Sequence, residues 1–71
     1  MNTKSENIFS KTELKIIKLL EEGLSNKSIS ERYNISENTV KFHLKNIYRK
    51  LSVHNRLQAV HKIRKKNLSI H

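Results

Sequence analysis

The 71-residue chain has no cysteine, no proline, no aspartate and a single glycine. Without cysteine it can form neither disulfides nor thiolate zinc sites, so the reducing cytoplasm is its expected compartment. The acid pairs, thiol nucleophiles and glycine-rich phosphate loops of many enzymes are missing together, and we therefore expect neither catalysis nor a cofactor. No apolar stretch is long enough to span a bilayer or to form the core of a signal peptide, which predicts a soluble intracellular protein.

Histidine is the remaining candidate for metal binding. The four histidines are His43, His54, His61 and His71. Their spacing matches no common zinc motif, and no carboxylate lies among them. We therefore expect no metal site.

The length of the chain allows one domain and excludes a second. Only 35% of the residues are apolar and 6% are aromatic, so the core is expected to be small. Small cores give modest stability unless a partner adds buried surface. Dimerisation is therefore favoured before any motif is considered.

The formal net charge of +9 is concentrated in the second half of the chain. All six carboxylates are glutamates that lie at or before Glu37, where six lysines and arginines balance them. The other nine cations follow with no carboxylate among them: Lys41, Lys45, Arg49, Lys50, Arg56, Lys62, Arg64, Lys65 and Lys66. A one-sided charge of this kind attracts polyanions, most often nucleic acid, although a basic surface can also serve solubility alone.

The lack of proline and the single glycine favour helices joined by short turns. A first helix is predicted to begin after Ser10, where Glu13 completes a capping box, and to end at Gly23. Its apolar residues recur at helical spacing. They are Leu14, Ile16, Ile17, Leu20 and Leu24.

Three further helices are predicted along the rest of the chain. A short one begins after Ser25 and ends before Asn34, and a long one begins after Ser36 with Glu37 at its positive end. The long helix carries an apolar stripe. The stripe consists of Val40, Leu44, Ile47 and Leu51. A fourth helix opens near Asn55 and is expected to turn four residues inward, before it frays at Lys65, Lys66 and Asn67. The four are Leu57, Ala59, Val60 and Ile63.

These elements predict an all-α fold, a compact four-helix bundle that contains a helix-turn-helix without a wing. Residues 1–8 are predicted to form a flexible N-terminal arm or the stub of a linker, and residues 9–71 the domain. A short helix, a three-residue turn and a longer amphipathic helix form the pattern in which the second helix enters a DNA groove. Helix pairs of this kind also occur in ordinary bundles.

The predicted long helix carries a polar face opposite its apolar stripe. At about 100° per residue, this face holds Asn38, Lys41, Phe42, Lys45 and Arg49. Lysine and arginine can reach guanine edges in the major groove, and an apolar group can touch a thymine methyl. An exposed aromatic such as Phe42 also suits a protein interface. The alternative is a helix that is simply exposed to solvent on one side.

Three segments closely resemble the LuxR/GerE-type helix-turn-helix family of bacterial transcription regulators. They are GLSNKSI at 23–29, ISENTVKFHLKNIYRKL at 35–51 and NRLQAV at 55–60. The resemblance runs from about Phe9 to Leu68, and its central run is long, with fixed spacing. It implies a four-helix domain that binds promoter DNA as a dimer, often through the fourth helix.

The resemblance also implies roles for individual residues. Lys41, Phe42 and Lys45 take the base-reading positions. Contacts to DNA phosphates are expected from Ser25, Asn26, Lys27, Ser36, Thr39, His43, Arg49 and Lys50. For the two serines helix capping alone is the alternative, and for His43 it is a hydrogen-bonded structural role. The dimer interface is expected at Leu57, Val60, His61 and Arg64.

Together these features predict a sequence-specific, double-stranded-DNA-binding bacterial regulator that is cytoplasmic and associated with the nucleoid. A second copy of the chain and RNA polymerase are its expected partners. A membrane-surface or interaction module built on the basic stretch Arg56 to Lys66 is the competing hypothesis, but this stretch lacks bulky exposed aromatics. RNA binding is a weaker alternative, because no aromatic stacking platform is evident.

Overall fold

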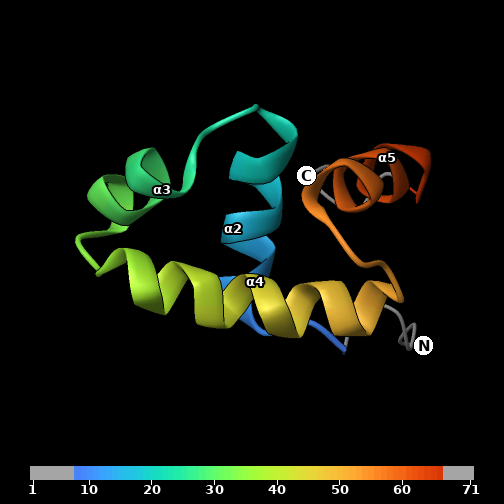
Figure 1. Cartoon of the computed structure of the whole chain (residues 1–71), viewed down its shortest axis with the longest axis horizontal. Helices are drawn as coiled ribbons and strands as arrows, with labels where there is room; N and C mark the ends of the chain where they lie inside the picture. The colour runs from blue at the N-terminus through green and yellow to red at the C-terminus, as the bar shows by residue number, and fades with distance from the viewer. Residues whose placement is uncertain (1–7, 67–71) are drawn as a thin grey trace.

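Four α-helices follow one another in the computed structural model, which describes residues 8–66 (Figure 1). They are α2 (Lys11–Glu21), α3 (Asn26–Tyr33), α4 (Glu37–Leu51) and α5 (Arg56–Lys66). No strand occurs in this part of the chain, so the predicted all-α, four-helix fold is confirmed. The predicted arm, except for the exposed Ile8, lies outside the described residues, as does the predicted fraying at Asn67.

Serine side chains begin three of the helices, as predicted. The Ser10 hydroxyl accepts a hydrogen bond from the backbone N–H of Glu13 at 3.0 Å, and the Glu13 carboxylate accepts one from the N–H of Ser10 at 2.9 Å. This reciprocal pair is the predicted capping box. Ser25 and Ser36 each accept from the N–H three residues on, which satisfies donors that have no partner inside the helix.

Residues in the left-handed conformation end the first three helices. Gly23 has a φ of 89° and follows α2, and Asn34 has a φ of 54° at the end of α3. Both residue types accept this conformation at low cost, and both were predicted to stop a helix. Ser52 ends α4 in the same way with a φ of 60°, which its residue type did not suggest.

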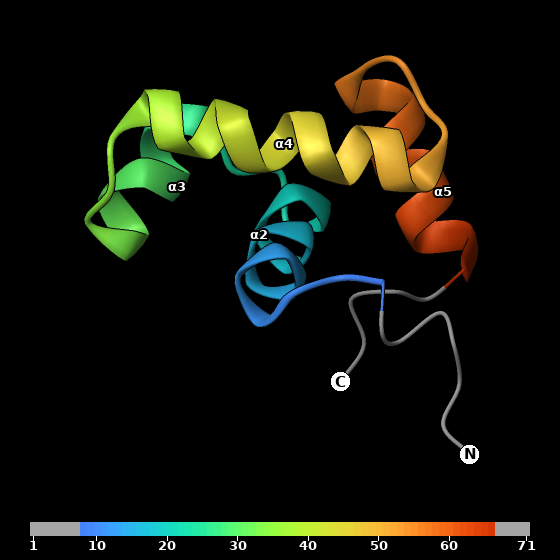
Figure 2. The ribbon, with the colours of Figure 1, turned by 90° about the horizontal axis from the view of Figure 1, so that it is seen from below.

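Helix α4 is the element against which the others pack. It contacts α2, α3 and α5. In Figure 2 it runs along one side of the molecule, with α3 near its first residues, α5 near its last and α2 between them. Along most of its length, the side of α4 turned away from α2 has no helix over it, and the start of α5 extends past it near the last residues of α4 (Figure 2).

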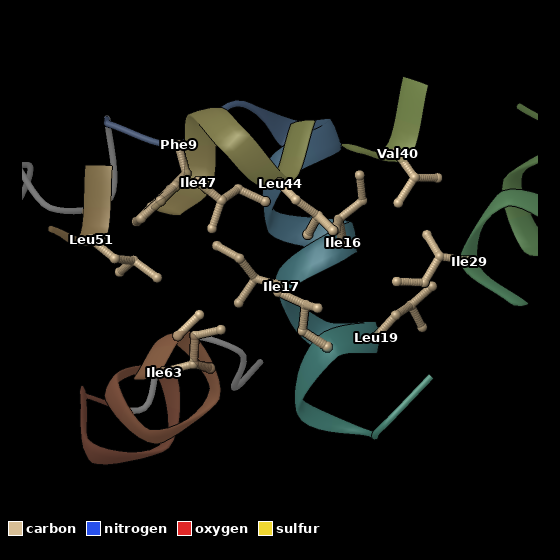
Figure 3. Close-up of a cluster of buried hydrophobic side chains, with 12 residues drawn as sticks. Phe9, Ile16, Ile17, Leu19, Ile29, Val40, Leu44, Ile47, Leu51 and Ile63 are labelled. Atoms are coloured by element: carbon tan, nitrogen blue, oxygen red, sulfur yellow. The ribbon is translucent and has the colours of Figure 1, made fainter. Parts of the chain in front are cut away.

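The core is a continuous group of aliphatic residues centred on α2 and α4 (Figure 3). Ile16 and Ile17 of α2 lie in its middle, with Ile29 and Val40 at one end and Ile63 at the other (Figure 3). The predicted stripe of α4 is entirely buried. The buried apolar residues are Phe9, Ile16, Ile17, Leu19, Leu20, Ile29, Val40, Leu44, Ile47, Leu51, Ala59 and Ile63.

Two predictions about inward-facing leucines were wrong. Leu57 is 81% exposed, because it lies about 200° around the helix from Ala59, the residue of α5 that does face the core. Leu14 is 38% exposed, and its neighbour Glu13 is buried instead. The periodicity of α2 did not reveal that a carboxylate would occupy a core-facing position.

The buried Glu13 forms an ion pair that joins the start of α2 to α4. Its Oε1 lies 2.6 Å from Nζ of Lys50, and that ammonium lies 5.8 Å from the centre of the Phe9 ring. Burial alone would raise the pKa of Glu13. The hydrogen bonds from Lys50 and Ser10, with the electrostatic influence of Lys50 and His43, outweigh burial and lower this pKa below its ordinary value.

Replacing Glu13 by Gln is expected to lower the free energy of unfolding at neutral pH by about 1–3 kcal/mol, because the charged partner of Lys50 is lost. Folding lowers the pKa of Glu13 below its ordinary value of 4.5. The ion pair therefore stabilises the folded protein fully above pH 4.5, and this stabilisation is lost as the pH falls through the lowered pKa. The stability difference between the two proteins should therefore shrink as the solution is acidified. Urea unfolding at several pH values measures it.

The exposed Glu31 provides the matched control. Glu31→Gln removes the same charge from α3 and is expected to change stability by less than about 0.5 kcal/mol. An equal loss of stability in both variants would contradict the role of the ion pair.

Candidate nucleic-acid interface

The outward face of α4 presents the three predicted base-reading residues to solvent. Lys41 and Lys45 are exposed, and Phe42 is 60% exposed. Burial of the aliphatic stripe on the opposite side of the same helix produces this orientation, since positions on one helix rotate together. Arg49, one turn beyond Lys45, is exposed as well.

The fold brings the start of α3 next to this face. Asn26, the first residue of α3, lines one open groove with Lys41, Lys45 and Arg49. The full lining is Asn26, Lys41, Leu44, Lys45, Tyr48, Arg49, Val53 and His54. Three cations and no carboxylate line the groove, so its charge suits an anionic ligand.

A neighbouring hollow at the start of α3 contains more of the predicted phosphate contacts. Ser25, Asn26 and Lys27 line it together with Glu37 of α4. Lys27 is exposed, and the backbone N–H groups of a first helical turn favour phosphate. Glu37 is the one acidic group of this hollow.

The hydroxyl groups of Ser25, Ser36 and Thr39 each form a hydrogen bond with another hydroxyl at their own helix start. The hydroxyls of Ser36 and Thr39 lie 2.9 Å apart, and those of Ser25 and Ser28 lie 3.1 Å apart. The capping role of both serines is therefore confirmed. Their contact with phosphate stays a prediction.

Four predicted phosphate contacts line neither the groove that holds Lys41 and Lys45 nor the hollow at the start of α3: Ser36, Thr39, His43 and Lys50. The side chain of Lys50 is 28% exposed, and its ammonium is held in the ion pair with Glu13. His43 is half-buried, meets the Phe42 ring edge to face at 5.5 Å, and lines a separate hollow with Thr12, Lys15, Tyr33 and Ile35. This arrangement suits the structural alternative for His43.

Two residues outside the predicted set lie at the interface. His54, in the turn between α4 and α5, is exposed and lines the groove. Arg56 opens α5 and donates hydrogen bonds to the carbonyl oxygen of Leu24 and, at 3.4 Å, to Oδ1 of Asn26. Arg56 belongs to the NRLQAV segment and to the basic half of the chain, but neither pattern indicates which groups it bonds to, because the turn and the packing of α5 bring both residues there.

Tyr48 lies beside Arg56 at the same junction. Burial raises the pKa of the Tyr48 phenol, and the positive charge of Arg56 offsets part of this rise. The phenol is therefore uncharged at neutral pH and adds no negative charge to the groove.

The four residues predicted for a dimer interface face different surroundings. Leu57 and His61 are exposed and line a largely apolar hollow with Val53, whereas Val60 is half-buried against the core. The guanidinium of Arg64 donates to the carbonyl oxygen of Glu21 at 3.1 Å, at the end of α2.

Within residues 8–66, no group of three or more histidine or acidic side chains is arranged to hold a metal ion. No helix in the same range has the length and apolar character needed to cross a membrane. His71 lies outside the described residues.

Comparison with known proteins gives a match to one family model. The model described as "Bacterial regulatory proteins, luxR family" matches residues 7–63, which covers all of α2, α3 and α4 and most of α5. This confirms the resemblance inferred from the three sequence segments. No solved structure matches the chain.

Several curated relatives share this region. The chain is 38% identical over 66 residues to the HTH-type transcriptional regulator AlkS of Alcanivorax borkumensis, which covers 93% of this chain and 8% of the relative. It is 45% identical over 53 residues to the nitrate/nitrite response regulator protein NarP of Escherichia coli, covering 75% of this chain and 25% of the relative. It is 43% identical over 54 residues to the transcriptional regulatory protein DegU of Brevibacillus brevis, covering 76% and 23%. The chain thus spans a quarter or less of the length of these relatives.

The two faces of α4 should respond differently to truncation. Phe42→Ala removes an exposed ring and is expected to lower the free energy of unfolding by less than about 1 kcal/mol. Ile47→Ala opens a cavity in the core and is expected to cost about 2–5 kcal/mol. Urea unfolding of both variants measures the difference, and a large loss from Phe42→Ala would show that this face is not a free surface.

Proposed function

The chain belongs to the luxR family of bacterial regulatory proteins, a family of DNA-binding transcription regulators, and we propose that it binds double-stranded DNA sequence-specifically through α4. One observation carries the proposal: Lys41, Phe42 and Lys45 are exposed on a helix whose other face is core. The major groove of B-DNA is about 12 Å wide and admits such a helix.

The side chains of α4 match the chemistry of base edges. Lys41 and Lys45 carry donors for the O6 and N7 acceptors of guanine, and Phe42 offers an apolar edge to a thymine methyl. Arg49 continues the same basic row and suits a phosphate that flanks the groove. Preference for particular base pairs therefore comes from Lys41, Phe42 and Lys45.

The helix starts supply the contacts that fix the orientation on the duplex. Asn26 and Lys27 lie in the first turn of α3, where free N–H groups and the helix dipole favour a phosphate. Ser36 and Thr39 offer the same arrangement at α4. Such contacts give affinity without base specificity.

We further propose that two copies of the chain bind two half-sites about one helical turn apart, joined through α5. Leu57 supports this proposal, because a leucine exposed to 81% on a small domain suits a protein contact. A regulator of this kind acts in the cytoplasm, at the nucleoid and beside RNA polymerase, which we propose as a further partner.

Substitution of Lys41 or Lys45 by Ala is expected to weaken binding by about 1–3 kcal/mol and to relax preference at particular base pairs. The duplexes are those selected from random DNA by the wild-type protein, and anisotropy titration gives the affinities. A uniform loss over all sequences would make these lysines phosphate contacts instead.

Lys18→Ala is the matched control, because Lys18 is exposed in the last turn of α2 and lines no part of the groove. It should change affinity much less than Lys45→Ala. Affinity should also fall steeply with salt, with a log–log slope of about 0.9 per phosphate neutralised. Retention on anionic vesicles at physiological salt, without retention of DNA, would favour the membrane-surface alternative.

Leu57→Glu tests the proposed dimer. A carboxylate in place of an apolar contact should shift the protein to the monomer in sedimentation velocity and remove cooperative binding to paired half-sites. The free energy of unfolding of the monomer should stay within about 0.5 kcal/mol, because the side chain is exposed. Leu57→Met keeps the apolar contact and should retain the dimer, and equal sedimentation of all three proteins would exclude this face.

A further inference from the structure

We propose that Arg56 is a positioning residue for DNA binding, which holds the amide of Asn26 with its donor side turned toward the DNA backbone. The inference rests on the proposed function, since it requires Asn26 to contact a phosphate. Arg56 itself acts through Asn26 and does not touch the DNA.

One guanidinium joins the first turn of α5 to both sides of the α3 N-cap. Nη2 of Arg56 donates to the carbonyl oxygen of Leu24, and Nη1 donates to Oδ1 of Asn26 at 3.4 Å. Leu24 and Asn26 flank Ser25, whose hydroxyl caps α3. Arg56 therefore holds the backbone before the cap and the first side chain after it.

The chemistry of the two groups determines which side of the amide faces Arg56. Arginine has five N–H donors and no acceptor, whereas an asparagine amide has one oxygen acceptor and one NH₂ donor group. Only the oxygen of Asn26 can therefore bond to Arg56. The NH₂ group is left on the other side of the amide.

A phosphate oxygen accepts hydrogen bonds and cannot donate them, so a phosphate needs that NH₂ group. Asn26 borders the groove of Lys41 and Lys45, where a duplex would approach α4. If the amide rotated by half a turn, it would present its oxygen to the phosphate and repel it. Arg56 prevents this rotation by holding the oxygen.

The surroundings of Arg56 favour this indirect role over direct contact with DNA. Arg56 is half-buried at the junction of three helices and lines the α3 hollow beside Tyr48 and Asn26. It is absent from the lining of the groove that holds Lys41, Lys45 and Arg49. Its guanidinium is already bonded to two oxygens of its own chain.

Asn26→Asp tests the loss of the NH₂ donor without a loss of stability. Aspartate keeps an oxygen for Arg56 and adds a charge that the start of α3 favours, so the thermal midpoint should not fall. The same change removes the NH₂ donor and places a negative charge against the phosphate. The affinity of the 71-residue protein for the selected duplex should fall by about tenfold or more.

A double-mutant cycle tests whether Arg56 acts through Asn26. Asn26→Ala and Arg56→Gln should each weaken binding of the selected duplex by about 5- to 20-fold, and the double variant should bind no more than about twofold worse than Asn26→Ala alone. Thermal unfolding identifies the temperature range in which every variant is folded. Arg32→Gln is the control, because it removes the same charge from the exposed last turn of α3, and it should bind within about threefold of wild type.

Two results would overturn the inference. One is wild-type affinity in Asn26→Asp. The other is additive losses in the double variant, with a further drop of about 0.9 in the salt slope on loss of Arg56, because Arg56 would then bind a phosphate itself. Lys45→Ala distinguishes failure of the Arg56 role from failure of DNA binding through α4. If Lys45→Ala weakens binding and one of these two results is also found, only the role of Arg56 is rejected. Unchanged binding in Lys45→Ala would reject the proposed use of α4.

Discussion

Burial of the aliphatic stripe of α4 is the constraint on which the rest of the structure depends. Helix α4 contacts every other described helix, and Val40, Leu44 and Ile47 are at most 5% exposed. A helix rotates as a rigid unit, so fixing this stripe against α2 also fixes the direction of Lys41 and Lys45. The outward basic face is thus a consequence of core packing and needs no bound ligand to form. A binding surface that is formed in advance loses little conformational entropy when a ligand binds.

The tertiary structure divides the cations of the second half of the chain into two groups. One group bonds within the chain: Lys50 to Glu13, Arg56 to Leu24 and Asn26, Lys62 to the carbonyl oxygen of Leu51, and Arg64 to that of Glu21. The carbonyl oxygens of Glu21 and Leu51 lie at the last residues of α2 and α4, where positive charge is favourable. The other group is exposed and consists of Lys41, Lys45, Arg49, Lys65 and Lys66. Four of the nine cations in the second half of the chain are therefore engaged by other groups of the same chain, which the net charge of +9 does not reveal.

Most of the fold could be predicted because its signals act over three or four residues. The capping box of Ser10 and Glu13, the cap at Ser36 and the end of the short helix before Asn34 are each local, and all three were predicted correctly. The errors arose where the burial of a side chain depended on contacts between helices that are distant in the sequence. Leu57 matched an apolar pattern on a short helix with few apolar residues, and only the packing of Ala59 and Ile63 determined which side of α5 faces inward.

The amino-acid sequence by itself determined the helices, the aliphatic stripe of α4, the membership of a regulator family and the identity of the residues on the outward face of α4. The tertiary structure alone decided which cations are held within the chain, that a carboxylate is buried at Glu13, and that Arg56 meets Asn26. The physical reason is the distance along the chain between the residues that interact. Caps and helical periodicity connect residues three to four positions apart. By contrast, the partners Glu13 and Lys50 are 37 positions apart, and Asn26 and Arg56 are 30 apart, so only the packing of whole helices brings them together.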